Sequence, residues 1–241
     1  MKFYNAFYKQ NLPIDFVAEK DDFNKYKLIL APLQFLVDDK MVEKFTKYVM
    51  QGGTLIFTMR SGVKEMNNQC HIEKDLPGKL TELVGATIRE YDCLRDMDMG
   101  IRYKDKDYRS EIWCDVLEPN TATSLVKYTE DYYSDQSCVT VNNLGKGQVY
   151  YIGTEPEQKF IDDFFGDIIE DLGIQGLSTN NNEIELVRRR TKNEDYIFAL
   201  NHSAKEKTIE VDDDWERLIN NEKLEPYGYA LFKVERGQSI S

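Results

Sequence analysis

The sequence predicts an α/β fold in which an open, mostly parallel sheet is flanked by helices and followed by a small antiparallel β domain. Residues 26–57 carry an apolar run, an amphipathic stretch and a second apolar run, the pattern of a strand, a crossover helix and a parallel strand. Residues 156–172 form a second amphipathic stretch that predicts a long helix. After residue 182 the apolar period changes to two, as is typical of half-buried antiparallel strands.

The segment 26–57 is the organising βαβ unit. Residues 27–33 form an apolar run without alternation after the opening Lys27, as a strand covered on both faces requires. Asp38 and Asp39 can cap the following helix and complement its dipole, and the apolar positions between 41 and 49 share one helical face. Gly52 and Gly53 end this helix, and residues 54–59 form the second strand.

The remaining elements of the first domain are predicted in chain order. The chain opens with a helix over residues 1–10, followed by a strand at 14–18. Residues 60–76 form a long polar loop, whose length makes it a candidate contact surface. The next expected elements are a short helix at 79–84 closed by Gly85, strands at 86–91, 122–128, 137–142 and 148–153, and a hairpin turn at 143–147.

A polar linker at 178–182 separates two predicted domains, residues 1–177 and residues 183–241. The second domain is small and antiparallel, with strands expected at 185–191, 195–201, 207–211 and 228–234.

Composition excludes several classes of function. The 241 residues carry a formal net charge of −12, which repels nucleic acid and anionic lipid. We find no apolar run long enough to span a bilayer and no signal-peptide core, so a soluble, cytoplasmic protein is expected. The four cysteines are scattered without a Cys-x-x-Cys pair, which favours reduced thiols over a zinc site or a disulfide framework. No metal or cofactor is predicted.

Several ordered motifs resemble the C-terminal half of the family 42 glycoside hydrolases, the bacterial β-galactosidases. The anchors cover nearly the whole chain: IDFV at 14–17, YKLILAP at 26–32, YVMQGGTL at 48–55, RSG at 60–62, PGKL at 77–80, LVG at 83–85, LGKGQVYYIG at 144–153, FALNH at 198–202 and PYG at 226–228.

This resemblance implies a non-catalytic role. Residues 1–174 are similar to the family's trimerisation domain, whose fold is related to class I glutamine amidotransferases and is flavodoxin-like. The remainder is similar to the small C-terminal β domain. The implied function is homotrimer formation in a β-galactosidase of carbohydrate metabolism, with no catalytic residue in this chain.

The chain departs from the family pattern in two ways. Family members carry both catalytic glutamates on an upstream (β/α)8 barrel, which needs about 250 residues by itself and is not expected here. The family's trimerisation domain also begins with a strand before the helix that starts at Met1. We therefore expect a fragment, an engineered piece or a gene remnant, whose partner is a barrel if one is encoded upstream.

The amidotransferase likeness makes residues 58–62 the place of a nucleophile elbow. No cysteine stands there and the first glycine is missing, so Ser61 would need a nearby base. The two histidines are His71, which follows Cys70, and His202, for which a structural hydrogen bond is expected. An enzyme with a Ser61 or Cys70 nucleophile is therefore the least favoured alternative.

A second alternative is a degenerate module that binds a small ligand or sugar at the carboxyl ends of the strands, near Pro32 and Ser61. The acidic clusters at 155–157, 162–163 and 212–214 lie in turns or on the wet side of a helix, so they predict no catalytic carboxylate pair. The turn Gly145-Lys146-Gly147 joins two strands and is not a phosphate loop.

The candidate interface or cleft residues come from polar segments. The loop 60–76 and the segment 91–108 are the expected trimer contacts. Aromatic residues in polar turns favour interfaces as well. The candidate binding residues are Arg60, Ser61, His71, Tyr132 and Tyr133.

Overall fold

The computed structural model describes residues 2–72, 74–177, 179, 181, 183–211, 215–220 and 222–235. Parts of the predicted linker (178, 180 and 182) and the acidic run 212–214 lie outside these residues. The chain divides into two compact units, Val17–Phe160 and a second made of Met1–Phe16 with Ile161–Ser241. No helix in the described ranges is long and apolar enough to cross a membrane.

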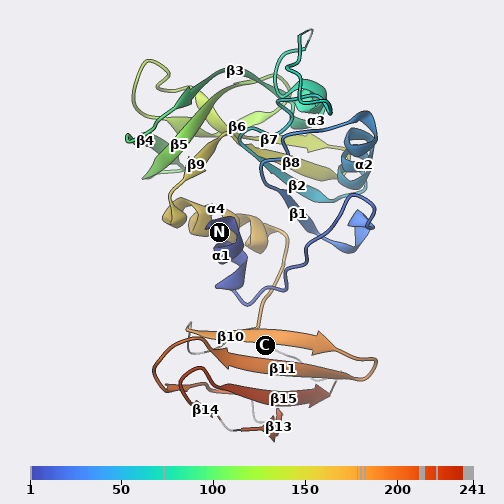
Figure 1. Ribbon diagram of the computed structural model, residues 1–241, viewed down its shortest axis with the longest axis vertical. Coiled ribbons are helices and arrows are strands. Elements are labelled where there is room, and N and C mark those ends of the chain that lie inside the picture. Colours follow the sequence, from blue (N-terminus) through green and yellow to red (C-terminus); the bar gives the residue numbers. More distant parts are fainter. Residues whose placement is uncertain are drawn as a thin grey trace. The chain divides into compact units, whose positions relative to one another are not determined.

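The larger unit, Val17–Phe160, contains the predicted βαβ unit (Figure 1). Strands β1 and β2 pair in parallel from Leu28 opposite Thr54, and β2 pairs in parallel with β8. The Asp38 carboxylate caps the helix by accepting the Met41 N–H at 2.8 Å, as predicted. The elements are β1 (Leu28–Ala31), α2 (Asp39–Met50), β2 (Thr54–Thr58) and β8 (Gly147–Ile152).

The prediction of a mostly parallel sheet is wrong. In the nine-stranded sheet, ordered β1-β2-β8-β7-β6-β4-β5-β3, every pairing of the described strands beyond β2–β8 is antiparallel. Where consecutive strands are joined by a short connection they pair antiparallel, as β4 does with β5, β6 with β7 and β7 with β8. They are β3 (Ala86–Cys93), β4 (Met99–Tyr103), β5 (Lys106–Pro119), β6 (Thr123–Tyr128), β7 (Ser137–Leu144) and β9 (Thr154–Pro156), which pairs with β5.

The strand predicted at 14–18 is absent, because these residues form no sheet pairing in the structure. Phe16 is 89% exposed, so the local alternation of apolar residues does not correspond to a buried face. A short apolar segment becomes a strand only where a neighbouring strand accepts its backbone hydrogen bonds.

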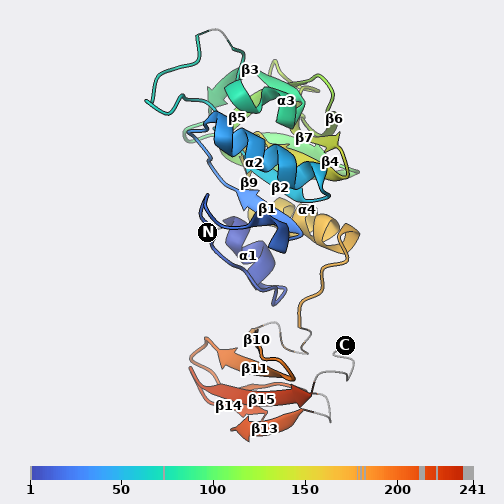
Figure 2. The same cartoon turned by 90° about the vertical axis from the view of Figure 1, so that its right-hand side faces the viewer.

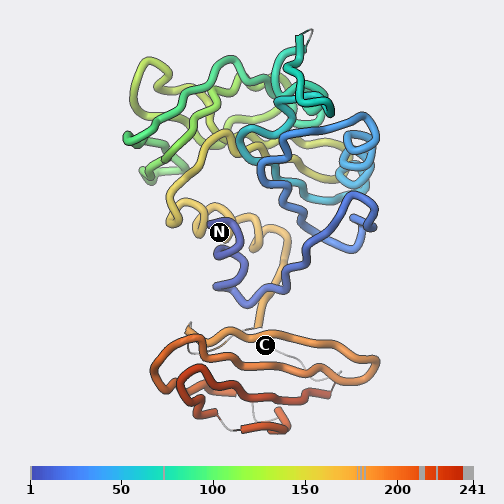
Figure 3. The backbone as a smooth tube through the Cα atoms, viewed as in Figure 1, coloured from blue at the N-terminus to red at the C-terminus, as the bar shows by residue number. Residues whose placement is uncertain are grey.

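Helices cover the parallel strands of this unit (Figure 2). Phe45 of α2 packs edge-on against Phe57 of β2, with 5.2 Å between ring centroids. The same core contains Val49, Leu55 and Tyr151, each fully buried. Figure 3 follows the chain from β2 through the long loop to the short helices that complete this layer. These are η2 (Gly78–Leu80) and α3 (Thr81–Val84), and a further turn, η1 (Phe23–Lys25), precedes β1.

The second unit combines two helices with an antiparallel sheet. Phe3 and Phe7 of α1 (Lys2–Tyr8) pack on Phe165 of α4 (Gln158–Asp171), with centroids 5.8 and 5.2 Å apart. The predicted antiparallel domain is confirmed by the strand order β10-β11-β15-β13 and by the pair β12–β14. Its strands are β10 (Ile184–Arg190), β11 (Glu194–Asn201), β12 (Lys207–Thr208), β13 (Glu216–Ile219), β14 (Lys223–Leu224) and β15 (Tyr229–Glu235).

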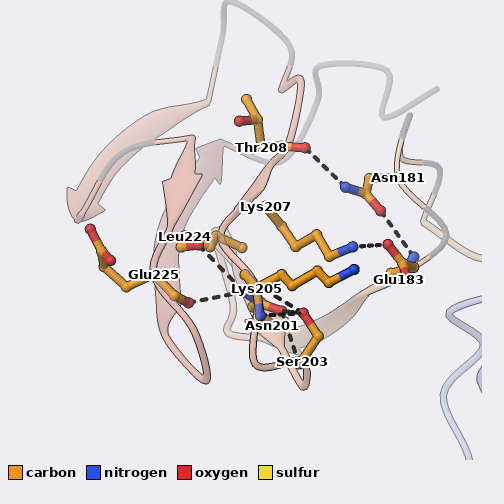
Figure 4. A network of polar contacts seen from close by, with 9 residues as sticks. All are labelled: Asn181, Glu183, Asn201, Ser203, Lys205, Lys207, Thr208, Leu224 and Glu225. Atoms are coloured by element: carbon orange, nitrogen blue, oxygen red, sulfur yellow. Dashed lines mark hydrogen bonds and ion pairs between the residues drawn. The ribbon is translucent and has the colours of Figure 1, made fainter.

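Asn201, the last residue of β11, holds two turns of this sheet together (Figure 4). Its Nδ2 donates to the carbonyls of Lys205 at 2.7 Å and Glu225 at 2.9 Å, and its Oδ1 accepts from the Ser203 N–H at 3.0 Å. The next residue, His202, bonds through Nε2 to Glu185 Oε2 at 2.6 Å, which confirms the expected hydrogen bond. The Asn-His motif is therefore structural.

We expect Asn201→Ala to lower the free energy of unfolding by about 3 kcal/mol, because the change leaves the buried Leu224 carbonyl and two partly buried carbonyls without their donor. Urea unfolding followed by tryptophan fluorescence measures the loss. Lys205→Ala is the matched control, because it keeps the accepting backbone carbonyl, and it should change stability by less than about 0.5 kcal/mol. Equal losses in the two variants would show that the amide of Asn201 is unimportant.

Candidate functional site

The carboxyl ends of β1, β2 and β8 meet at one edge of the parallel strands, where open α/β sheets place their ligands. The turn after β2 brings Arg60 to this edge in a left-handed conformation, with φ 64°. Gly62 follows with φ 69°, and its N–H donates to the Gln34 carbonyl at 2.9 Å. The loop after β1 is thereby tied to the turn after β2.

Ser61 is a structural residue of this turn. Its side chain is fully buried, and its Oγ donates to the Thr58 carbonyl at 2.7 Å. The same Oγ accepts the Gln34 N–H at 3.1 Å. A hydroxyl committed to two backbone partners and closed to solvent cannot attack a substrate.

His71 and Cys70 do not form a catalytic pair. The His71 Nε2 lies 3.0 Å from the Gly62 carbonyl, and its Nδ1 lies 2.9 Å from Glu65 Oε1 without forming a hydrogen bond, so the ring is directed away from Cys70. The exposed Cys70 thiol instead accepts from Lys64 Nζ at 2.9 Å. The histidine fastens the long loop to the turn after β2.

Tyr132 and Tyr133 have different environments, although both were expected at an interface. Tyr132 is 74% exposed, and its hydroxyl donates to Glu90 at 3.1 Å. Tyr133 is 1% exposed and packs edge-on against Tyr128, with 5.0 Å between ring centroids. The expectation is therefore wrong for Tyr133, because its ring completes the core of the antiparallel strands.

Sequence reasoning missed Asp115, a buried carboxylate on β5 that lies at the same edge. It accepts from Trp113 Nε1 at 2.7 Å, from the Tyr151 hydroxyl at 3.2 Å and from the Arg60 N–H at 3.4 Å. Burial raises the pKa of Asp115 to about 6, although these three hydrogen bonds and the Arg60 charge oppose the shift.

The Arg60 guanidinium lies among aromatic rings. Its Cζ is 4.6 Å from the centroid of the Trp113 ring, 5.5 Å from that of Tyr91 and 5.4 Å from that of Phe35. Tyr91 and Trp113 stack with centroids 5.0 Å apart. We refer to Phe35, Arg60, Tyr91 and Trp113 as the Arg60 cluster, which is an arrangement of cation–π contacts.

The arrangement suits binding better than catalysis. Within the described ranges, no group of three or more metal-ligating side chains gathers. Ser61, Cys70 and His71 have separate partners, so these three described residues do not combine into a nucleophile and its base. The exposed part of this edge is the Arg60 guanidinium packed against aromatic rings. Such a surface is suited to contact with another molecule.

Comparison with protein families gives two matches. The family model of the β-galactosidase trimerisation domain matches residues 1–175, and that of the β-galactosidase C-terminal domain matches residues 183–233.

Among characterised proteins, a β-galactosidase of Clostridium cellulovorans is 33% identical over 96% of this chain, which covers 36% of that protein. A β-galactosidase of Clostridium perfringens is 31% identical, also over 96% of this chain and 36% of its own length. The chain thus spans little more than a third of these relatives.

Solved structures agree with these matches. A β-galactosidase from Bacillus circulans superposes with a TM-score of 0.89 at 28% identity, over 97% of this chain and 36% of its own. A family 42 β-galactosidase from G. stearothermophilus superposes with a TM-score of 0.91 at 26% identity, over 98% of this chain and 36% of its own. The chain therefore belongs to glycoside hydrolase family 42, the β-galactosidases, of which it represents the non-catalytic trimerisation and C-terminal domains.

Proposed function

We propose that this chain assembles subunits of a family 42 β-galactosidase into homotrimers and is a non-catalytic accessory region. The match of residues 1–175 to the trimerisation domain carries the proposal. The proposed partners are two further copies of the chain and, where one is encoded upstream, a barrel that contains the catalytic glutamates. In this proposal residues 1–177 form the assembly domain, and residues 183–241 form a small accessory β domain.

The proposed fold relationship is to the class I glutamine amidotransferases. The parallel strands β1, β2 and β8 with α2 support it, as does the turn after β2, where Arg60 takes the left-handed conformation. A nucleophile elbow is also a strained turn between a strand and the residues that follow it. In this chain that position holds an arginine, which fits a module that has kept the turn and lost the chemistry.

We propose the cytoplasm as the site of action. Cys70 and Cys93 are free and exposed, which suits a reducing compartment. The net charge of −12 adds to the expectation that neither nucleic acid nor a membrane is a partner.

Sedimentation equilibrium of the purified chain tests the assembly role. We expect a concentration-dependent species with three times the 28.2 kDa chain mass, because cyclic assembly closes with three heterologous contacts. A chain that stays monomeric up to millimolar concentration would contradict the proposal.

Hydrolysis of a chromogenic β-galactoside tests the non-catalytic role. No turnover is expected from the chain alone, because Ser61 is buried and Cys70 and His71 face other partners. The Ser61→Ala and Cys70→Ala variants, purified identically, measure any contaminating enzyme. Turnover that disappears in one of these variants would restore the enzymatic alternative.

A further inference from the structure

We propose that the Arg60 cluster, together with the exposed side chains of Leu33 and Ile112, is the surface on which a second copy of this chain docks, with a carboxylate of that copy bound to the Arg60 guanidinium. The inference rests on the proposed self-association and deepens it, because it assigns the contact to particular residues. It differs from the loop and strand segments singled out from sequence, since most of its members come from separate elements.

The first argument is that the Arg60 guanidinium has no ion-pair partner among the described side chains. Its guanidinium packs on Trp113, and no described side chain forms a salt bridge or hydrogen bond with it. Of the other four arginines on this unit, Arg102 pairs with Asp107 at 2.7 Å and Arg109 with Glu130 at 2.7 Å. A guanidinium offers five donors in a fork that fits a carboxylate, so the unused donors of Arg60 point to an incoming acid.

The second argument is that Asp115 fixes the Arg60 cluster before a partner binds. The buried Asp115 carboxylate receives the Trp113 indole N–H at 2.7 Å and the Arg60 N–H at 3.4 Å. Asp115 thereby fixes the Trp113 ring, on which the guanidinium packs, and the backbone of Arg60. Side chains fixed before binding lose less conformational entropy when a partner arrives. Asp115 is therefore a positioning residue that need not touch the partner.

The third argument is backbone strain at three bulky residues. Leu33, Arg60 and Ile112 have φ values of 50°, 64° and 47°. Positive φ is uncommon for side chains of this kind and is an outlier for a β-branched residue such as Ile112. Leu33 is 54% exposed and Ile112 is 51% exposed, so strained backbone here places apolar groups in solvent. Such strain gathers at functional sites.

The fourth argument is a bulge in β5. Its pairing with β9 shifts between Glu111 and Cys114, so Ile112 and Trp113 are inserted between paired residues. Bulges re-aim side chains, and they are frequent next to functional sites. Here the bulge accompanies an exposed Ile112 and a Trp113 ring that lies under the Arg60 guanidinium.

Charge and composition favour another copy of this chain as the occupant. The chain has 43 acidic and 31 basic residues, so the surface of a second copy presents mostly carboxylates. Trp, Tyr and Arg are the residues enriched at interaction hot spots, and the Arg60 cluster combines all three with exposed aliphatic groups. In a cyclic trimer each copy uses this surface once and offers a different, acidic surface to the next copy.

Sedimentation equilibrium of the full chain tests the inference with two variants. Arg60→Ala and Ile112→Gly are each expected to raise the dissociation constant of the trimer at least about tenfold. Ile112→Gly has a second readout, because glycine accepts a positive φ without strain. Below the dissociation constant, its thermal midpoint should equal or exceed that of the unchanged chain. A merely structural isoleucine would instead lower the midpoint.

Arg217→Ala is the matched control, because Arg217 lies on β13 of the other unit and is paired with Glu222. It should leave the dissociation constant unchanged.

A trimer that forms equally well with Arg60→Ala and Ile112→Gly would overturn this inference and leave the assembly role intact. A chain that is monomeric at every concentration would overturn both. Saturable tryptophan quenching by lactose, lost in Arg60→Ala while the trimer persists, would assign the surface to a sugar and overturn the docking of a second copy.

Discussion

Gly147→Ala is expected to destabilise the larger unit by about 3 kcal/mol or more. Gly147 opens β8 at the end of the turn whose LGKGQ motif supports the family resemblance. A β-carbon there would overlap the carbonyl oxygens of Gly53 and Val49.

The overlap cannot be relieved cheaply, because both oxygens belong to backbone at the junction of α2 and β2. The same junction receives the Gln148 N–H at the Gly53 carbonyl, 3.3 Å away, and the Lys146 N–H at the Met50 carbonyl, also 3.3 Å away. Moving the turn to make room would weaken these hydrogen bonds and shift β8 against β2.

Chemical unfolding of the two alanine variants Gly147→Ala and Gly166→Ala measures this effect. Gly166 lies within α4, and a β-carbon there would meet no atom within 4 Å. Because alanine favours helix by about 1 kcal/mol over glycine, Gly166→Ala should stabilise the chain. The two variants make the same chemical change with opposite expected signs. A Gly147→Ala protein as stable as the unchanged chain would show that the turn is not closely packed.

Asp115→Asn is expected to remove a pH dependence of stability worth about 3 kcal/mol between pH 4 and pH 7. The pKa of Asp115 in the folded chain is about 6, against an ordinary value of 3.8. Between these values the folded state holds a proton that the unfolded state has released. The free energy of unfolding therefore falls as pH rises through this window and levels off above pH 6.

Urea unfolding of both proteins from pH 4 to pH 7 tests this expectation. The stability of Asp115→Asn relative to the unchanged chain should rise across the window, because asparagine has no charge to bury. Asp107→Asn is the control, because the hydrogen bond from Arg102 lowers the pKa of Asp107 and the pH dependence that this carboxyl contributes lies at lower pH. Parallel stability curves for Asp115→Asn and the unchanged chain would mean that the carboxyl at position 115 keeps an ordinary pKa.

The βαβ unit could be predicted because its signals are local. The uninterrupted apolar run of β1, the capping Asp38 and the glycines after α2 each act on their own segment. Strand β5 and the hairpin that it forms with β4 were missed. Residues 104–109 are mostly charged or polar, and the bulge at 112–113 breaks the alternation that reveals a half-buried strand.

The candidate site divides in the same way. Sequence alone identified Arg60 as a candidate, because it lies in the turn after a parallel strand. It did not identify Trp113, Tyr91 or Asp115, which come from antiparallel strands about thirty to fifty residues away along the chain. Ser61 and His71 were identified, but their polar atoms are directed to backbone and loop partners.

The sequence by itself therefore determined the family, the parallel core and the antiparallel character of the second domain. Periodicity, helix caps and ordered motifs each depend on residues that are close together in the sequence. Only the tertiary structure decided that most of the large sheet is antiparallel, that Tyr133 is core and that Arg60 lies on aromatic rings held by Asp115. Those features depend on strand pairing, on burial and on the cost of an uncompensated charge. Each of these arises only when distant segments of the chain come into contact.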